Sequence, residues 1–164
     1  MNIKFEKLSI EHQKPVMEIF NFYIAGSTAA FPATVLPEPF YEMLMKKSEG
    51  LSAYALLENN QNKVVGFCSL NPYSPFSTFK ATATITYFID KEYVGKGLGT
   101  QCLAKLEEDA HELGIHNIIA EISSRNDDSI GFHKKHGFEL VGKLNDIGEK
   151  LDSIFSVVYM QKTI

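Results

Sequence analysis

The sequence predicts a single α/β domain built around a mixed, largely antiparallel sheet. Its 164 residues suit one domain with a sizeable core, and 45% of them are hydrophobic and 22% charged, as is ordinary for a globular protein. Strand-like and helix-like stretches follow one another in the order β-α-α-β-β-β-α-β-α-β-β. No repeat, low-complexity tract or linker interrupts them, so we expect residues 1–164 to form one domain.

The first half of the chain supplies two helices between strands. Apolar and polar residues alternate over 2–7, which predicts a strand, and Ser9 is placed to cap the helix that follows. A second helix is expected over 38–47. Two β-rich stretches, 52–59 and 63–73, flank "NQN" at 60–62 and predict a tight hairpin. The apolar face expected for the first helix consists of Val16, Ile19, Phe20 and Tyr23.

The second half alternates strands with helices and ends in a hairpin. A strand is expected over 81–90, and a helix over 98–113 that Gly114 terminates. The expected apolar side of this helix is Leu98, Cys102, Leu103, Leu106, Ala110 and Leu113, and the expected wet side is Lys105, Glu108, Asp109 and Glu112. A strand at 117–123, a helix that begins at Asn126, and strands at 138–146 and 153–161 complete the chain.

Charge and composition exclude several classes of protein. The net charge of −4 argues against nucleic-acid binding, which requires a basic surface. The N-terminal residues contain no signal-peptide core, and no apolar run is long enough to span a bilayer, so we expect a cytoplasmic protein that does not bind membranes. Cys68 and Cys102 are expected to be buried thiols, and no Cys/His spacing predicts a metal site.

The segment "DKEYVGKGLGTQCL" joins a predicted strand to a predicted helix through Gly95, Gly97 and Gly99. Backbone amides at such a junction point at one place and suit a phosphate group. The spacing G-x-G-x-G matches neither the Walker loop nor the Rossmann loop. The glycines alone therefore leave two interpretations open: a turn that needs glycine for its conformation, or a phosphate cradle.

The surrounding sequence resembles the GCN5-related N-acetyltransferase superfamily. Gly97 and Gly99 match the two small positions of its [RQ]-x-x-G-x-[GA] loop, and "NDDSIGFHKKHGF" resembles the helix that follows. Val94 replaces the usual Arg or Gln, and Gly95 lies outside the motif and is expected to be incidental. "IFNFYIAGSTAAF", "GFHKKHGFELVGKLNDIGEK" and "VVYMQK" extend the resemblance over nearly the whole chain, toward the phosphinothricin and methionine sulfoximine acetyltransferases.

This resemblance implies acetyl-CoA as co-substrate and no metal. It implies a fold of six or seven strands and about four helices, in which the strand ending at Ile89 and the strand 117–123 run parallel and splay apart around the cofactor. Phe88, Ile89 and Asp90 would pair with the pantetheine, and Asn126 would contact it, cap its own helix, or do both. The pyrophosphate would lie on Val94, Gly95, Lys96, Gly97, Leu98, Gly99 and Thr100.

The resemblance also places the catalytic groups, with one departure. His133 occupies the position of the acid that assists the departing thiolate, and is also expected to line the CoA site. The glutamate usual on the splayed strand is replaced by Thr84, which cannot act as a base. Three interpretations are open: a water chain removes the proton, Glu121 on the neighbouring strand substitutes, or catalysis is weak.

The acceptor would be the primary amine of a small molecule, an amino acid or an analogue. A basic residue would recognise its carboxylate, and Lys80 is the local candidate. The expected acceptor-site residues are Phe31, Tyr73, Phe76, Phe79, Lys80 and Thr84. The leading hypothesis is an N-acetyltransferase that works by direct attack in a ternary complex. The alternative is an acyl-CoA-binding module with little turnover, and a homodimer formed through the C-terminal hairpin is a further expectation.

Overall fold

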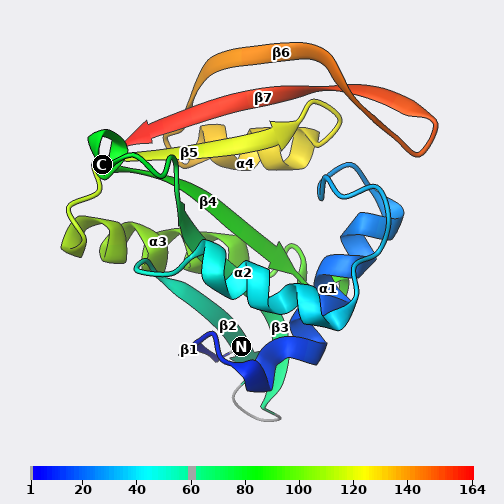
Figure 1. The fold of residues 1–164 in the computed structure, drawn as a ribbon, viewed down its shortest axis with the longest axis vertical. Helices are drawn as coiled ribbons and strands as arrows, with labels where there is room; N and C mark the ends of the chain where they lie inside the picture. Colours follow the sequence, from blue (N-terminus) through cyan, green and yellow to red (C-terminus); the bar gives the residue numbers. More distant parts are fainter. Residues whose placement is uncertain (1, 59–61) are drawn as a thin grey trace.

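The computed structural model describes residues 2–58 and 62–164, and it contains one sheet of seven strands in the order β1-β2-β3-β4-β5-β7-β6 (Figure 1). The strands are β1 (Ile3–Lys7), β2 (Ala53–Glu58), β3 (Lys63–Pro72), β4 (Thr82–Ile89), β5 (Asn117–Ser123), β6 (Glu139–Lys150) and β7 (Ser153–Thr163). This arrangement confirms the predicted mixed α/β fold. The hairpin turn expected at 60–62 falls mostly outside the described residues.

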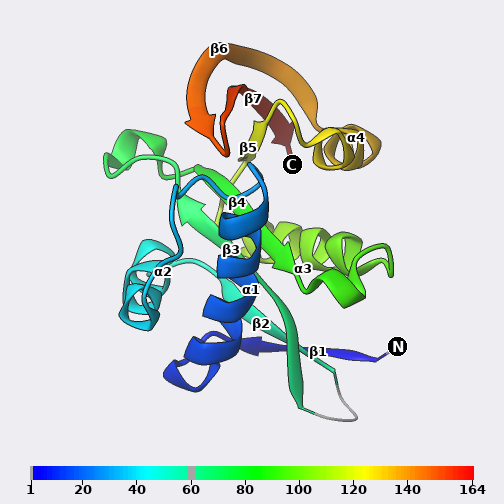
Figure 2. The same cartoon turned by 90° about the vertical axis from the view of Figure 1, so that its right-hand side faces the viewer.

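Within the described residues, four α-helices cover the two faces of the sheet. They are α1 (Gln13–Gly26), α2 (Tyr41–Lys47), α3 (Leu98–Glu112) and α4 (Asp127–Lys135). Helices α2 and α3 lie on opposite sides of the central strands (Figure 2). Among the described residues, no helix combines the length and the apolar character that crossing a bilayer would require.

The parallel pair β4–β5 opens after a short contact. Every other neighbouring pair is antiparallel, whereas β4 and β5 are parallel and share only the pairs Thr82–Asn117, Ala83–Ile118 and Thr84–Ile119. Beyond these pairs the two strands diverge, and Figure 1 shows the resulting V between them. The expected splayed pair is therefore present. Its narrow end lies at the start of both strands.

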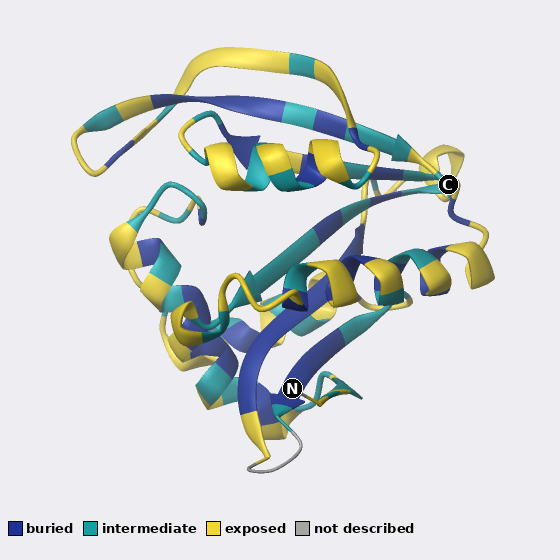
Figure 3. Cartoon of the chain, turned by 180° about the vertical axis from the view of Figure 1, so that it is seen from behind, coloured by how far each residue is buried: buried dark blue, intermediate teal, exposed yellow. Residues whose placement is uncertain are grey.

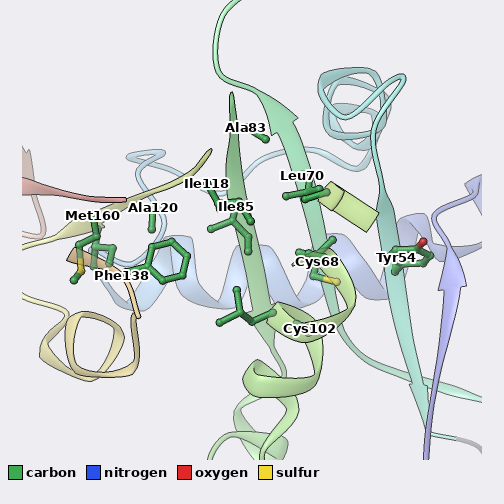
Figure 4. Close-up of a cluster of buried hydrophobic side chains, with 14 of the residues drawn as sticks. Tyr54, Cys68, Leu70, Ala83, Ile85, Cys102, Ile118, Ala120, Phe138 and Met160 are labelled. Carbon is green, nitrogen blue, oxygen red and sulfur yellow. The ribbon is translucent and has the colours of Figure 1, made fainter. Parts of the chain in front are cut away.

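Two hydrophobic cores hold this sheet, one on each face. The larger core packs the apolar side of α3 against β2–β5 and β7, with Cys68, Cys102, Ile85 and Ile118 near its centre (Figure 4). The smaller core packs α1 and α2 against the other face of β2–β4. Both cysteines are fully buried free thiols, as the sequence predicts. Because the cores clamp the middle of the sheet, the V opens in a rigid frame.

Three details of the prediction are wrong. Asp109 is buried and not on the wet side of α3, because its carboxylate accepts hydrogen bonds from Tyr54 Oη (2.6 Å) and Lys105 Nζ (2.7 Å). Leu113, expected on the apolar side, is 46% exposed because α3 has ended at Glu112. Strand β6 runs on to Lys150 through a register shift, and nearly all of it is exposed (Figure 3).

Candidate active site

The glycine loop joins β4 to α3 with two glycines in left-handed conformations. Gly95 has φ +78° and Gly97 has φ +81°, a region that side chains disfavour. Gly95 is therefore not incidental, because it is required for the turn as much as Gly97 is. An ideal Cβ on either residue would meet no neighbouring atom within 4 Å, so both positions border open space.

The first turn of α3 presents free backbone donors beside this loop. Gln101 N donates to Gly97 O, which leaves the N–H groups of Leu98, Gly99 and Thr100 without a helical partner. The Leu98 side chain is 1% exposed and anchors the turn in the core. No acidic residue lies in this turn, while Lys96 Nζ lies 4.6 Å from the centre of the Tyr93 ring. The amides, the helix dipole and the lysine together favour an anion such as a pyrophosphate.

Helix α4 packs directly on the start of α3. A Cβ on Gly99 would lie 3.4 Å from the Phe132 ring, so Gly99 allows the close contact between the two helices. Thr100 Oγ1 and His136 Nε2 are 3.1 Å apart, which adds a polar link. Asn126 caps α4, since its Oδ1 accepts from Ser129 N at 3.2 Å. The capping role proposed for Asn126 is thus present, and its contact with a cofactor stays a prediction.

The register of β4 decides which backbone groups face the V. Asp90 N donates to Val65 O and Tyr73 N donates to Thr82 O, so the even-numbered residues of this stretch pair with β3. The backbone groups of Tyr87 and Ile89 consequently face the opening toward β5. Of the three residues expected to pair with pantetheine, Phe88 and Asp90 are already paired with β3.

Among the described residues, the N–H of Ile89 has no partner in the sheet on this side, whereas its carbonyl already accepts a hydrogen bond from α1. Tyr23 Oη of α1 donates to Ile89 O at 2.5 Å, and this contact ties α1 to the open end of β4. Val94, which follows in the loop, is 60% exposed and makes no core contact. A backbone role for Val94 therefore does not depend on which side chain it carries, which fits its departure from the family pattern.

His133 of α4 is buried and contacts β4 through Tyr87. Its Nε2 makes a short hydrogen bond with the Tyr87 hydroxyl, and its Nδ1 lies 2.7 Å from Ser129 O. A carbonyl can only accept, so Nδ1 carries the proton and Nε2 accepts the proton of Tyr87. Burial lowers the pKa of His133, despite the opposing hydrogen bond to Ser129, and burial raises the pKa of Tyr87. Both groups are therefore neutral near pH 7.

The opposite face of the same strands carries a second set of polar groups. Ile118, Ala120 and Ile122 of β5 point into the larger core, so Glu121 points to the other face. The register places Thr84 beside Ile119 on that same face, with Thr86 two residues farther along β4. Glu121 is solvent-exposed and lies opposite Tyr159 of β7. This face is bordered by the loop 27–36 between α1 and α2 (Figure 1).

The acceptor residues expected from the sequence do not all come together. Burial raises the pKa of Tyr159, with smaller contributions from the charge of Glu121 and from Tyr73. Tyr73 also packs on Phe79, with ring centres 5.5 Å apart. Phe76 is 70% exposed at the loop tip and Lys80 is also exposed.

Phe31 lies at a different place, against the C-terminal hairpin. Its ring stacks on Phe155 at 6.0 Å with an interplanar angle of 23°. Nearby, Thr28 Oγ1 and Ser123 Oγ are 2.7 Å apart, which connects the loop after α1 to the end of β5. The residues 27–31 therefore close the wide end of the V on the Glu121 face.

Sequence reasoning missed Tyr87 and Tyr159. Tyr87 lies within an unbroken β-branched and aromatic run, and only the strand register shows that it faces α4. Tyr159 was predicted only as part of a strand, and its pairing with Glu121 depends on the β5–β7 register. Side chains alternate between the two faces of a strand, and Val158 and Met160 on either side of Tyr159 are apolar and buried. This alternation is the one signal that would have placed Tyr159 on the polar face.

A splayed parallel strand pair beside an anion-binding helix start defines an α/β domain that can hold an extended, phosphate-bearing ligand in its sheet. A sequence model of the acetyltransferase (GNAT) family matches residues 16–138, most of the chain. This protein therefore belongs to the acetyltransferase (GNAT) family.

Individual proteins agree with this assignment. The chain is 35% identical over 99 residues, 60% of its length, to the L-methionine sulfoximine/L-methionine sulfone acetyltransferase of Pseudomonas aeruginosa, and spans 58% of that relative. It is 30% identical to the protein of the same name from Salmonella typhimurium, over 89% of this chain and 85% of the relative. The fold is similar to that of a Sinorhizobium meliloti phosphinothricin acetyltransferase solved with AcCoA (TM-score 0.93, 20% identity, 100% of this chain and 89% of that chain).

Proposed function

We propose that this protein is an N-acetyltransferase that moves the acetyl group from acetyl-CoA to the primary amine of a small amino acid or amino-acid analogue. The observation that carries the proposal is the V between β4 and β5, whose two faces offer different chemistry. One face has the anion-binding loop at Gly97 and the neutral pair Tyr87–His133. The other has the carboxylate of Glu121. The relatives named for methionine sulfoximine acetylation support the substrate class.

In this proposal the acceptor attacks the thioester directly while both substrates are bound. The pyrophosphate lies on the glycine loop, and the pantetheine pairs with the free backbone groups of Tyr87 and Ile89. Glu121 removes a proton from the acceptor ammonium, directly or through water, because only the free amine is a nucleophile. Holding the amine in line with the thioester supplies much of the rate enhancement.

The test combines binding with turnover. Acetyl-CoA is expected to raise the melting temperature of the protein, and thiol release is expected with methionine sulfone or a related amino acid from a panel that also includes polyamines and peptide N-termini. No stabilisation at saturating acetyl-CoA would overturn the proposal. Stabilisation without thiol release from any acceptor would instead favour the acyl-CoA-binding module, which Thr84 in place of the usual glutamate suggests.

Replacing Glu121 by glutamine is expected to lower kcat/KM roughly 10- to 100-fold at pH 7, since general-base catalysis is lost. The rate of the variant is expected to rise toward that of the wild type as the pH increases, because a larger fraction of the acceptor is then already deprotonated. Glu112→Gln removes an exposed carboxylate from the end of α3 and serves as the control. Equal rates and pH profiles for Glu121→Gln and wild type would assign the base to water or another group.

We further propose that β6 mediates a homodimer. It is a twelve-residue edge strand with several exposed apolar side chains, namely Leu140, Val141, Leu144 and Ile147. An unpaired apolar edge of this length is a pairing surface unless it is covered. Light scattering is expected to give the mass of two chains, and Leu144→Lys with Ile147→Lys is expected to give one. Met43→Lys, at an exposed apolar residue of α2, should leave the mass unchanged. A single-chain mass for the wild type would contradict the proposal.

A further inference from the structure

The buried residue of the exposed strand β6 is a lysine. Every other residue of β6 is exposed or half-buried, whereas Lys150 is only 5% exposed. Lysine is rarely buried, because removing its charge from water is costly unless the charge is paired. Burial correspondingly lowers the pKa of this side chain. The position of Lys150 therefore calls for a compensating interaction.

The protein supplies only part of that compensation. Lys150 Nζ donates to the backbone carbonyl of Ala30 at 2.6 Å. An ammonium group has three donors, so two remain for other acceptors. Among the residues that the structure describes, no carboxylate forms an ion pair with Lys150, although seven ion pairs occur elsewhere. The positive charge is thus built into the protein without its counter-charge.

The location of Lys150 connects it to the Glu121 face of the V. Its partner Ala30 belongs to the loop that Thr28 fastens to Ser123, at the wide end of the V. The stacked rings of Phe31 and Phe155 lie along the same contact between loop and hairpin. An unpaired cation beside an aromatic pair suits a small molecule that combines a carboxylate with an apolar side chain.

We propose that Lys150 is the residue that binds the carboxylate of the proposed amino-acid acceptor, and that it thereby selects against simple amines and polyamines, which lack a carboxylate. This inference rests on the proposed acetyltransferase function. It replaces Lys80 as the carboxylate-binding residue, because Lys80 lies exposed in the β3–β4 loop, where water screens its charge. The Phe31–Phe155 pair then contacts the apolar part of the same molecule.

The test compares methionine sulfone with its carboxamide, which keeps the amine and the side chain but lacks the negative charge. The wild type is expected to prefer the carboxylate by roughly 10- to 100-fold in kcat/KM, the effect of one charge-assisted hydrogen bond in a buried site. Lys150→Met is expected to remove this preference, mainly through a higher KM for the carboxylate, while turnover of the carboxamide stays within a few-fold. Lys150→Arg should restore part of it.

Two controls separate binding from a structural role. Lys143→Met removes an exposed lysine from the same strand and should leave kcat/KM unchanged for both substrates. Lys80→Met tests the rival residue. If Lys150 only holds the loop at Ala30, Lys150→Met will slow both substrates equally, and the inference is wrong. It is also wrong if Lys80→Met removes the preference or if the wild type has none. Failure of the proposed function looks different, because the wild type would then release no thiol with either substrate.

Discussion

Gly97→Asp is expected to weaken acetyl-CoA binding by roughly 100-fold or more, because several charge-assisted hydrogen bonds are lost together. The new side chain would project from a residue with φ +81° into open space beside the loop on which the pyrophosphate is proposed to lie. Its carboxylate would also accept hydrogen bonds from the free backbone N–H groups at the start of α3, and its negative charge would repel the phosphates. Isothermal titration calorimetry with acetyl-CoA measures the effect directly.

The control for this experiment is Gly114→Asp. Gly114 also has a left-handed φ, +71°, and open space around its Cβ position, but it follows the opposite end of α3. Both variants are expected to lose on the order of 1–2 kcal/mol of unfolding free energy, because a side chain in this conformation is strained. Only Gly97→Asp should lose acetyl-CoA affinity. Unchanged affinity in that variant would show that the pyrophosphate lies elsewhere.

The sequence contains enough local information to predict most elements of this fold. The loop around Gly97 is visible because glycines, a β-branched strand and an amphipathic helix are adjacent in the chain. Asn126 is visible for the same reason, since a cap lies next to the helix that it starts. The expected features that failed, such as the wet position of Asp109, depend on partners far away in sequence, here Tyr54.

The parts of the site that could not be predicted depend on strand register and on long-range contacts. Periodicity shows that β4 is a strand, but it does not show which backbone groups β3 already uses, so Phe88 and Asp90 could not be distinguished from Ile89. Lys150 is a stronger case. From the sequence, a lysine at the end of an exposed strand is expected to face solvent. Only its hydrogen bond to Ala30, 120 residues away in the sequence, shows that Lys150 is buried.

The Tyr87–His133 hydrogen bond is expected to be the other large contribution to catalysis. His133 Nδ1–H is fixed on Ser129 O, so the neutral ring has no second proton to give, and it acts as a positioning residue for the Tyr87 hydroxyl. We propose that the Tyr87 hydroxyl turns from Nε2 toward the departing sulfur and gives it its proton as the C–S bond of the tetrahedral intermediate breaks. We expect Tyr87→Phe to lower kcat roughly 100-fold, as is usual when a general acid is lost, with acetyl-CoA affinity changed only a few-fold.

A double-mutant cycle decides whether the two residues work as one unit. His133→Ala should lower kcat by a similar factor, and the double variant should be little worse than either single one, because each substitution breaks the same hydrogen-bonded pair. His133→Gln, whose side-chain oxygen can accept from Tyr87, should recover part of the activity. Tyr41→Phe removes another buried hydroxyl, which donates to Ser9 O, and should leave kcat unchanged. Additive losses in the cycle would mean that His133 acts independently of Tyr87, and would return the role of acid to the histidine itself.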